Sequence, residues 1–378
     1  MSLKIGIVTE YYFPLLGGIT ENVHNTMQLL KKSGYEVKVI TSNYNQNGLV
    51  RHDNTINYDG PDIIRIGHSI PIYSNGSLAH ITFGRNLKFK IQSILNEEKF
   101  DILHIHSPIV LTLPYLSLIE AKCHCVGTFH TYFDRSLIYS LFKSQFQKNL
   151  DKLAGQIVVS RCCIDALQRY FKINPRIIPN GVDTDLFNPM AQPIERYNGD
   201  KLNLLFLGRF DPRNGLAFMI KVFKIIKEKF ANVRLIIAGD GLLRYYYKKL
   251  VPNELLSDVI FEGVIWGTRP NYYSSCDVFC SPIKKASFGI TLLEAMASGK
   301  PIVATENMGY KEILSPDEGF LIPQNDHNAF AEAVLCLLRN KELRVKMGEN
   351  GRKKALRYSW PNVFSEIMDY YKEIFGKL

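Results

Sequence analysis

Short apolar runs alternate with helical spacing along the first half of the chain. The runs at residues 5–9 and 37–40 predict buried strands. Between them, Val23, Met27 and Leu30 follow the i, i+4, i+7 spacing that marks one face of a helix. Three later apolar runs extend the pattern, at residues 101–106, 125–129 and 156–160. Strands that alternate with helices predict a parallel sheet covered by helices on both faces.

The second half repeats this organisation. A helical stretch at residues 216–230 lies among five runs that predict strands, at residues 202–207, 233–238, 259–261, 278–280 and 301–304. Residues 189–200 are polar and contain proline, as a linker should. The chain is therefore expected to fold as two doubly wound, Rossmann-like α/β domains, residues 1–188 and 189–359. Such sheets bind ligands at the carboxyl ends of their strands, so the cleft between the domains is the expected site.

The composition is that of a globular protein with a large core. The 378 residues are 46% hydrophobic and 22% charged, which excludes a mainly disordered, collagen-like or coiled-coil chain. No apolar run reaches the length of about 18 residues that a membrane-spanning helix needs. The first strand follows Met1 closely and no signal-peptide pattern surrounds it, so a cytoplasmic location is expected.

The net charge of +10 is diffuse and favours anionic partners. Nucleic acid is not expected among them, because no basic stripe interleaved with aromatic residues occurs. The seven cysteines are expected to be free thiols, as is usual inside the cell. Four of them, Cys123, Cys125, Cys162 and Cys163, match no common zinc spacing, and no metal-binding site is expected.

Two stretches combine glycine with a predicted helix start. Gly17 and Gly18 follow the first strand, where helix N–H groups would stabilise a phosphate, although the two glycines by themselves favour a tight turn. Residues 287–301 predict a loop, a helix that starts at Gly289, a glycine stop and a strand. One turn inside that helix, Glu294 is placed to accept two hydrogen bonds from a vicinal diol such as a ribose, unless it is an ordinary exposed glutamate.

Several motifs together resemble the retaining, nucleotide-sugar-dependent glycosyltransferases of the GT-B fold. These are residues 206–209 (FLGR), 178–183 (IPNGVD) and 287–294 (SFGITLLE). The resemblance covers the whole chain, including residues 358–360 (YSW) before an amphipathic helix. In this fold the C-terminal helix crosses back to the first domain. The resemblance therefore implies an acceptor-binding domain of residues 1–188 with 360–378, and a nucleotide-sugar-binding domain of residues 189–359.

A closer likeness lies in the first domain. Residues 71–79 (PIYSNGSLA) and 126–131 (VGTFHT) are similar to the acceptor region of the phosphatidyl-myo-inositol mannosyltransferases. Those enzymes transfer mannose from GDP-mannose to an inositol phospholipid at the inner membrane face. His80 stands where that family has an arginine, so a different acceptor, such as another lipid, a polyol or a glycan, stays open.

The resemblance implies a role for each matching residue. On the donor side, Arg209 neutralises the diphosphate leaving group, Glu294 holds the ribose and Gly263 with Val264 reads the base through the backbone. The donor diphosphate is approached by the backbone of Gly17, Gly18, Ser287, Phe288, Gly289 and Ile290.

On the sugar and acceptor side, His130 lies beside the transferred sugar and forms a hydrogen bond to a hydroxyl group. A buried core histidine is the alternative interpretation of this residue. Asn75 and Ser77, with His80, face the acceptor. His130 and Arg209 are therefore the candidate catalytic residues.

Two donor-side positions depart from the family pattern. Asn214 stands where a second diphosphate-binding lysine is usual, and Ala286 where a carboxylate usually contacts the donor sugar. Arg213, Lys284 or Lys285 can supply the missing positive charge, whereas nothing nearby replaces the carboxylate. Losing one charged contact in the transition state costs about 10²–10³ in rate. A catalytically impaired protein that binds nucleotide or glycan is therefore the alternative to a hexosyltransferase.

The expected reaction is transfer of a hexose, with mannose favoured, and retention of configuration without a protein nucleophile. GDP-mannose is the favoured donor and a UDP-sugar the other candidate. No cofactor is expected on the protein itself, and Mg²⁺ enters only as a companion of the donor.

Two basic and apolar segments bear on membrane contact. Arg85, Lys88 and Lys90 begin a predicted helix, and residues 136–150 combine six large apolar side chains with lysines. Such a helix can lie on the anionic surface of the inner face of a membrane as a peripheral element. A core-facing helix with solvated lysines is the equally weighted alternative.

Overall fold

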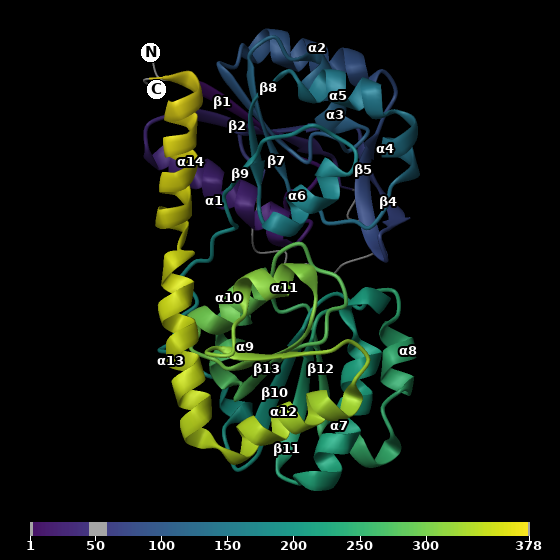
Figure 1. Ribbon diagram of the computed structural model, residues 1–378, viewed down its shortest axis with the longest axis vertical. Helices are drawn as coiled ribbons and strands as arrows, with labels where there is room; N and C mark the ends of the chain where they lie inside the picture. Colours follow the sequence, from purple (N-terminus) through teal and green to yellow (C-terminus); the bar gives the residue numbers. More distant parts are fainter. Residues whose placement is uncertain (1–2, 45–58, 377–378) are drawn as a thin grey trace. The chain divides into compact units, whose positions relative to one another are not determined.

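The computed structural model describes residues 3–44 and 59–376, and the chain forms two compact units (Figure 1). The described part of the first unit comprises residues 3–44, 59–180 and 361–376. The described part of the second unit comprises residues 181–360. The chain thus leaves the first unit before the polar stretch 189–200, because residues 184 and 187 already belong to the second unit. There Arg352 Nη1 donates hydrogen bonds to the carbonyls of Thr184 (3.0 Å) and Phe187 (2.9 Å).

The first unit is built on a parallel sheet that has seven strands within the described residues, in the order β3-β2-β1-β6-β7-β8-β9. The strands are β1 (Lys4–Val8), β2 (Glu36–Ser42), β3 (Ile63–Ile66), β6 (Ile102–His106), β7 (His124–Phe129), β8 (Leu153–Val158) and β9 (Arg176–Ile177). The helices are α1 (Gly18–Lys32), α2 (Leu87–Glu98), α3 (Leu113–Glu120), α4 (Leu137–Leu141), α5 (Lys143–Leu150), α6 (Arg161–Gln168) and α14 (Trp360–Phe375).

Continuous apolar runs explain the centre of this sheet. Ile5, Ile7 and Val8 of β1 are fully buried, as a strand covered on both faces requires. Helix α1 buries Val23 and Leu30 on one face and ends before Gly34, whose φ of 91° lies in the left-handed region that ends many helices. The strand order reverses between β1 and β6, so the loops after these two strands flank the point where doubly wound sheets bind ligands.

A separate hairpin extends from the first unit. Strands β4 (His68–Ser74) and β5 (Ser77–Phe83) pair antiparallel around a turn at Asn75 and Gly76. Both turn residues have positive φ, 51° and 77°, as a two-residue hairpin turn requires. The stretch identified from its likeness to an acceptor region is therefore a β-hairpin with ordered backbone.

Within its described residues, the second unit has a six-stranded parallel sheet in the order β12-β11-β10-β13-β14-β15. The strands are β10 (Leu202–Leu207), β11 (Val233–Ala238), β12 (Val259–Gly263), β13 (Val278–Ser281), β14 (Ile302–Thr305) and β15 (Gly319–Ile322). The α-helices are α7 (Leu216–Lys229), α8 (Arg244–Lys249), α9 (Arg269–Ser275), α10 (Ile290–Ala297), α11 (Met308–Ile313), α12 (His327–Arg339) and α13 (Lys341–Arg357). Short 3₁₀ turns are η1 (Glu195–Tyr197), η2 (Pro212–Asn214), η3 (Asn253–Leu255) and η4 (Trp266–Thr268).

This sheet reverses its strand order between β10 and β13. Its core is formed by side chains from both strands and from α7 and α12, including Phe206, Phe223 and Phe330, which are at most 1% exposed. The loops after β10 and β13 therefore emerge side by side at the carboxyl edge of the sheet.

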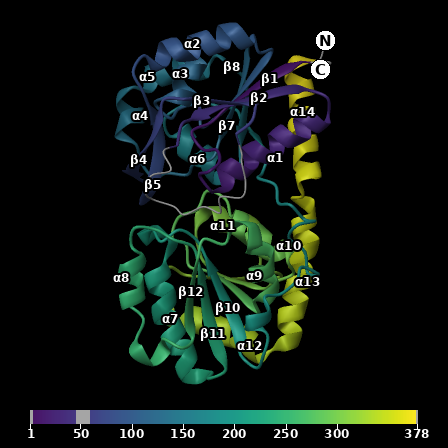
Figure 2. The ribbon, with the colours of Figure 1, turned by 180° about the vertical axis from the view of Figure 1, so that it is seen from behind.

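The C-terminal helix α14 packs on the first unit, as expected (Figure 2). The Tyr370 hydroxyl accepts a hydrogen bond from the backbone N–H of Gln156 at 2.9 Å, and the Tyr371 hydroxyl lies 2.6 Å from Nδ1 of His104. A Cβ on Gly155 would lie 2.3 Å from Ile374, so this close approach requires glycine.

The sequence prediction of two doubly wound α/β domains is confirmed, and each predicted strand is present. The single helix expected over residues 136–150 is wrong, because the chain breaks at Phe142 between α4 and α5. Leu137 and Leu141 of α4 are exposed, while Phe146 and Leu150 of α5 are buried. The two halves of this stretch thus face different surroundings.

Candidate functional site

The loops after β10 and β13 contact each other through their backbones. The N–H of Lys284 donates to the carbonyl of Arg213 at 2.9 Å. A Cβ on Gly215 would lie only 2.1 Å from the Pro282 carbonyl oxygen, and Gly215 has a φ of 78°. Only glycine fits there, and its presence lets the two loops approach each other closely. The structure therefore brings together the donor-side candidates of residues 209–214 and 286–290.

Arg209 and Asn214 define the first of these loops. The Arg209 side chain is 48% exposed, and its guanidinium lies 3.4 Å from the Asp211 carboxylate. Asn214 is buried and its amide donates to the Arg209 carbonyl at 2.7 Å. At the position where the family resemblance leads to the expectation of a lysine, this chain thus has a side chain that closes the loop behind Arg209.

The second loop leads into α10. Gly289 is the N-cap residue of this helix and, as a glycine, has no side chain that could cap its first N–H groups. Gly309 of α11 packs directly on the loop, since a Cβ there would lie 2.6 Å from the Ala286 carbonyl oxygen. Ala286, Ser287 and Ile290 are half-buried, and Phe288 is buried. Uncapped N–H groups at the positive end of a helix are suited to an anion.

Glu294 is fully buried, in contrast to the exposed glutamate considered as the alternative. One carboxylate oxygen lies 2.5 Å from the Arg269 guanidinium, and the other accepts a hydrogen bond from the Tyr273 hydroxyl at 2.8 Å. Burial and the adjacent Glu294 raise the pKa of Tyr273 well above its ordinary value. Both carboxylate oxygens therefore have partners within the second unit.

Arg269 and Tyr273 were missed from the sequence. They stand four residues apart on α9, on the same helical face, and that spacing is the signal that could have found them. The Arg269 guanidinium also lies over the Trp266 ring, 3.9 Å from its centre. The arginine thus links the candidate ribose-binding carboxylate to the segment that follows β12.

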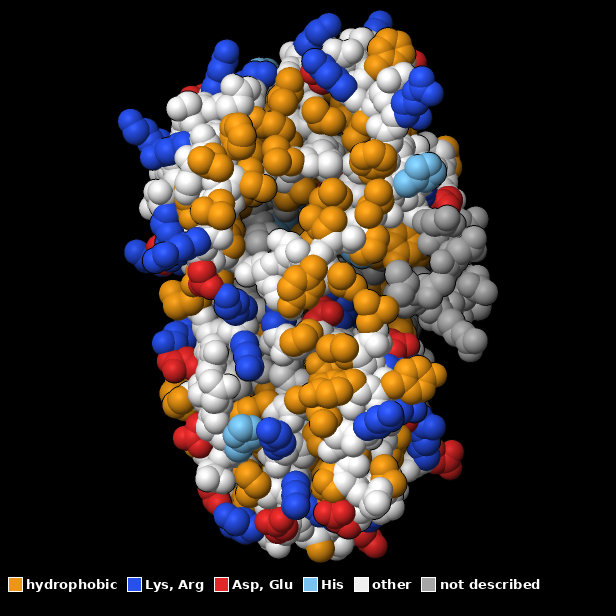
Figure 3. Space-filling view, turned by 90° about the vertical axis from the view of Figure 1, so that its right-hand side faces the viewer, with side chains coloured by type: hydrophobic (Ala, Val, Ile, Leu, Met, Phe, Trp, Pro, Cys, Tyr) orange, Lys and Arg blue, Asp and Glu red, His pale blue; other side chains and the backbone are white. Residues whose placement is uncertain are grey.

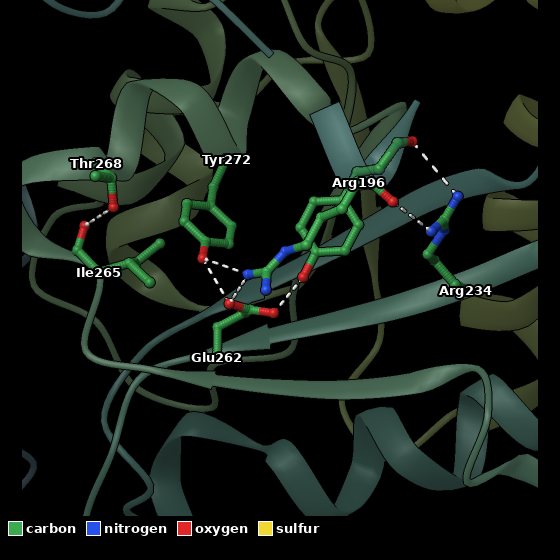
Figure 4. Close-up of polar contacts among 7 residues, drawn as sticks. Arg196, Arg234, Glu262, Ile265, Thr268 and Tyr272 are labelled. Carbon is green, nitrogen blue, oxygen red and sulfur yellow. Dashed lines mark hydrogen bonds and ion pairs between the residues drawn. The ribbon is translucent and has the colours of Figure 1, made fainter. Parts of the chain in front are cut away.

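The segment expected to read the base follows a polar cluster at the end of β12 (Figure 4). Glu262 pairs with Arg196 and accepts hydrogen bonds from the Tyr197 hydroxyl and, at 2.6 Å, from the Tyr272 hydroxyl. Burial and Glu262 raise the pKa of Tyr272 to about 12. Gly263 has a φ of 77° and open space where a Cβ would be. Glu262 therefore fixes the end of β12, where the Gly263 carbonyl accepts a hydrogen bond from the N–H of Gly239 at 2.7 Å.

In the first unit, the Gly17–Gly18 loop meets the start of α1. Gly17 is the N-cap residue and no side chain caps the helix. A Cβ on Gly17 would meet nothing within 4 Å, so the space beside it is open. Glu10, in the loop after β1, accepts hydrogen bonds from the Thr112 hydroxyl, from Leu113 N–H (3.1 Å) and from the Thr82 hydroxyl (2.5 Å). It ties this loop to α3 and β5.

The candidate acceptor-binding residues of the hairpin are held by the loops that follow β1 and β7. The Asn75 amide donates to the Tyr132 carbonyl at 2.9 Å, two residues beyond His130. Ser77 is buried, and His80 is held through its backbone N–H, which donates to the Tyr11 hydroxyl at 3.0 Å. The structure therefore connects the acceptor-side hairpin to the loop that carries His130.

His130 is 8% exposed and lies against His106 of β6, which in turn stacks on His104 of the same strand. Its Nε2 atom is 2.8 Å from Nδ1 of His106. Burial lowers the pKa of His130 to about 3 and that of His104 to about 4. His130 is therefore a neutral imidazole at physiological pH, and its hydrogen-bonding capacity, rather than its charge, is available to a substrate.

Among the described residues, no group of three or more His, Cys, Asp or Glu side chains is placed to hold a metal ion. In the part of the chain that the structure covers, no helix is long and apolar enough to cross a membrane.

Family models match both units. Residues 16–186 match the model described as glycosyltransferase family 4, and residues 190–354 match glycosyl transferases group 1. Two similar proteins are the phosphatidyl-myo-inositol mannosyltransferases of Mycolicibacterium smegmatis and Mycobacterium tuberculosis. The first is 30% identical over 378 residues, covering 99% of this chain and 95% of that protein. The second is 31% identical over 386 residues, covering 99% and 98%.

Solved structures share the fold. Sucrose-phosphate synthase from Thermosynechococcus elongatus superposes with a TM-score of 0.77 at 21% identity, covering 99% of each chain. The Anabaena protein HepE, solved with UDP-glucose, gives a TM-score of 0.73 at 16% identity, covering 98% of this chain and 100% of HepE. Both confirm two α/β domains of the GT-B type.

Proposed function

The chain belongs to the glycosyltransferase group 1 family and is a hexosyltransferase, and we propose that it retains the anomeric configuration of the sugar it transfers. The proposed donor is a nucleotide diphosphate sugar, with mannose favoured as the hexose. The proposed acceptor is lipid-linked, a polyol or a glycan. The whole-chain likeness to mannosyltransferases at about 30% identity supports mannose, and it argues against the catalytically impaired alternative.

The observation that carries the proposal is the junction of the two donor-side loops. A half-exposed guanidinium at Arg209 stands on one loop, and the uncapped start of α10 ends the other. The backbone bond from Lys284 to Arg213 holds these loops together. Positive charge and N–H groups at one place suit a diphosphate, which must accept negative charge when the glycosidic bond breaks.

The remaining donor contacts follow from the same unit. In this proposal the backbone of Gly263 and Val264 contacts the base, and the open space beside Gly263 leaves room for it. Glu294 receives the ribose in this proposal, which requires the hydroxyl groups to share or replace its bonds to Arg269 and Tyr273. Mg²⁺, where the reaction uses it, comes with the donor diphosphate.

The first unit supplies the sugar and acceptor side. His130 forms a hydrogen bond to a hydroxyl of the transferred hexose, and the hairpin residues Asn75, Ser77 and His80 bind the acceptor. The Asn75 bond to the Tyr132 carbonyl supports this pairing of hairpin and His130 loop. His130 belongs to the first unit and Arg209 to the second.

An exposed apolar surface of the first unit supports contact with an anionic membrane (Figure 3). On α4, Leu137 and Leu141 are 81% and 77% exposed, and Phe142 follows at 57%. Phe83 and Phe89, at 65% and 70%, flank exposed basic residues at the start of α2. Apolar side chains beside lysines and arginines suit the interface of an anionic bilayer, here the inner face of the membrane.

A ligand panel tests the donor. GDP, UDP, ADP and their common sugar conjugates are titrated by calorimetry, each with and without Mg²⁺. Preferential binding of GDP-mannose is expected. Preference for a UDP-sugar would move the donor assignment within the same enzyme class, and failure to bind any nucleotide would overturn the proposal. With the bound donor, release of nucleoside diphosphate that depends on an acceptor, and a proton NMR spectrum of the product, test transfer and retention.

Vesicle sedimentation tests the membrane surface. Binding to vesicles that contain anionic lipid is expected at low salt, with a loss when Leu137 and Leu141 are both replaced by Ser. Leu242→Ser is the matched control, since Leu242 is 67% exposed on the second unit. Equal binding of all three proteins, or no binding of the unmodified chain, would contradict the assignment.

A further inference from the structure

Three imidazole rings are stacked in the interior of the first unit. His104 and His106 lie on the same face of β6, with ring centres 4.7 Å apart and planes 19° from parallel. His106 and His130 have ring centres 5.0 Å apart and planes 12° from parallel. His104 and His106 are at most 2% exposed, and only His130, at 8%, retains contact with the surface.

Hydrogen bonds continue this stack to the C-terminal helix. Nδ1 of His104 is bonded to the Tyr371 hydroxyl of α14 and Nε2 of His104 to the Thr128 hydroxyl, each at 2.6 Å. His106 Nδ1 and His130 Nε2 lie 2.8 Å apart. Burial keeps all three rings neutral, because it lowers each pKa far below the ordinary value.

A neutral imidazole has one N–H donor and one lone pair, so the 2.8 Å contact has two alternative directions. Either His106 donates from Nδ1 to Nε2 of His130, or His130 donates from Nε2 to Nδ1 of His106. The first alternative places the proton of His130 on Nδ1. The second leaves Nδ1 of His130 with a lone pair. A ligand of His130 would therefore meet a donor in one case and an acceptor in the other.

The other nitrogen of His106 decides between them. Its Nε2 atom is buried and has no hydrogen-bond partner among the described residues. If His130 were the donor, His106 would carry its proton on this atom, and a buried N–H group would lack an acceptor. If His106 is the donor, Nε2 has only a buried lone pair. Orphaned buried N–H groups are the rarer and more costly of the two.

We propose that His106 is a positioning residue that holds His130 in the tautomer protonated on Nδ1. The Nδ1–H group of His130 then donates a hydrogen bond to an oxygen atom of the transferred sugar. The tautomer stands on the geometry of the first unit alone, and only the identity of the ligand rests on the proposed function. In this tautomer His130 neither takes a proton from the acceptor nor accepts a hydrogen bond through Nδ1.

The tautomer can be measured without any substrate. The full chain is labelled with ¹⁵N-histidine, and long-range ¹H–¹⁵N spectra at neutral pH distinguish protonated from unprotonated ring nitrogens. Spectra of His130→Gln and His106→Asn assign the two rings by the loss of their signals. Protonation of both rings on Nδ1 is expected. A His130 ring protonated on Nε2 would overturn the proposal.

A pair of substitutions separates positioning from packing. His106→Asn keeps a side-chain N–H group where Nδ1 stands, while His106→Leu fills the space without a donor. With the donor that the ligand panel selects, we expect His106→Leu to lower kcat about tenfold to a hundredfold, as the loss of an aligned hydrogen bond does. His106→Asn should remain within about threefold of the unmodified chain, because its amide restores that bond.

A failure of the proposed function can be distinguished from a failure of the proposed role of His106. If no nucleotide sugar reacts, the proposed function fails and the spectra still decide the tautomer. If transfer occurs and both His106 variants have the same kcat, or the His130 spectrum is unchanged in His106→Leu, His106 does not position His130. Thermal melting of each variant identifies a folding defect, and the spectra of the unmodified chain keep the test decisive if His106→Leu does not fold.

Discussion

The second unit surrounds its candidate residues with charge, and the first unit surrounds them with neutral hydrogen bonds. Arg209 is half-exposed beside Asp211, and Glu294 is buried against Arg269. His130 lies instead in a stack of neutral rings. For a reaction that breaks a bond to a diphosphate, this division is sensible. In the proposed reaction, the charged groups stabilise the leaving group and the neutral groups orient the sugar.

The two arrangements also differ in what burial demands. A buried carboxylate needs a cation and further hydrogen bonds, and Glu294 has both from Arg269 and Tyr273. A buried histidine can release its proton instead, and then needs only a donor and an acceptor. The first unit can therefore place its histidines deep inside the fold, but only at a pH at which they stay neutral.

The largest expected effect follows from this pH limit. The pKa values of His104, His106 and His130 are lower in the folded state than the ordinary 6.5, so the unfolded state binds more protons below that pH. Each histidine lowers the free energy of unfolding by about 1.4 kcal/mol per pH unit as the pH falls from about 6.5 towards 4. Burial lowers the pKa of His24 as well, whereas burial raises that of Glu10, which acts in the opposite direction.

The second unit serves as the internal control. Both tryptophans, Trp266 and Trp360, belong to it, so their fluorescence follows its unfolding, while far-ultraviolet circular dichroism follows both units. Urea titrations at pH 7, 6 and 5 should show circular dichroism transitions that move to lower urea ahead of the fluorescence transition. Equal movement of both signals would show that the histidine stack does not set the acid sensitivity.

The second largest effect tests the charged candidate residues of the second unit. Arg209→Gln removes the cation proposed to stabilise the diphosphate leaving group, and kcat should fall about 10²–10³-fold. The side chain is 48% exposed, so the free energy of unfolding should change little. Steady-state kinetics and thermal melting measure the two quantities. Lys229→Gln, which removes a cation paired with Glu332 on the surface of the same unit, is the control and should retain activity.

The sheets of both units could be predicted because continuous apolar runs form their central strands. Three of the four edge strands were missed: β3 and β15, which have one buried residue each, and β9, which has two exposed ones. The fourth edge strand, β12, was predicted from its apolar run at residues 259–261, although it also has only one buried residue. The hairpin strand β4 was missed because it has no buried residue, and β5 because its two buried residues, Ser77 and Thr82, are polar. Short or exposed strands lack the pattern that burial imposes on a sequence.

The donor-side loops could also be predicted, because glycines and the likeness to a family mark them locally. The surroundings of His130 could not. His104 and Tyr371 are separated by 267 positions, and no local pattern pairs a residue of β6 with one of the last helix. Glu294 was identified but its burial was not, since that depends on Arg269 and Tyr273 from a different helix. Contacts between distant elements are properties of packing, which a single sequence does not display.

A third test exchanges residues within the charged site. Asn214→Lys restores the family residue but removes the bond to the Arg209 carbonyl and places an ammonium group at a buried position. We expect it to lower the free energy of unfolding by about 1–3 kcal/mol without raising the transfer rate. Ala286→Glu restores the other family residue at a half-buried position, and should change stability by less than about 0.5 kcal/mol.

Melting curves and initial rates distinguish these outcomes. A rise in rate with Ala286→Glu alone would show that the carboxylate was the missing contact. A stable and more active Asn214→Lys would instead show that the loop has room for the lysine, and that the Asn214 bond is dispensable.

The smallest effect compares one hydrogen bond in each unit. Tyr371 and Tyr273 are both fully buried tyrosines, and their hydroxyl groups contact His104 and Glu294 respectively. Tyr371→Phe removes a bond between neutral groups, which contributes about 0.5–1.5 kcal/mol. Tyr273→Phe removes a bond to a carboxylate paired with Arg269, and such bonds contribute about 1.5–3 kcal/mol. Urea unfolding at pH 7.5 should therefore show Tyr273→Phe as the less stable of the two by about 1 kcal/mol.

Which of the two variants has the lower free energy of unfolding tests the contrast between a neutral first unit and a charged second unit more directly than either value alone. Both substitutions remove the same atom from equally buried sites, so changes in volume and in the unfolded state largely cancel. If Tyr371→Phe is the more costly, His104 is not a neutral partner, and the stack carries a charge at pH 7.5. The tautomer of His106 would then be set by that proton. The first unit would no longer be the neutral one of the two, because a charge would lie at its buried histidines.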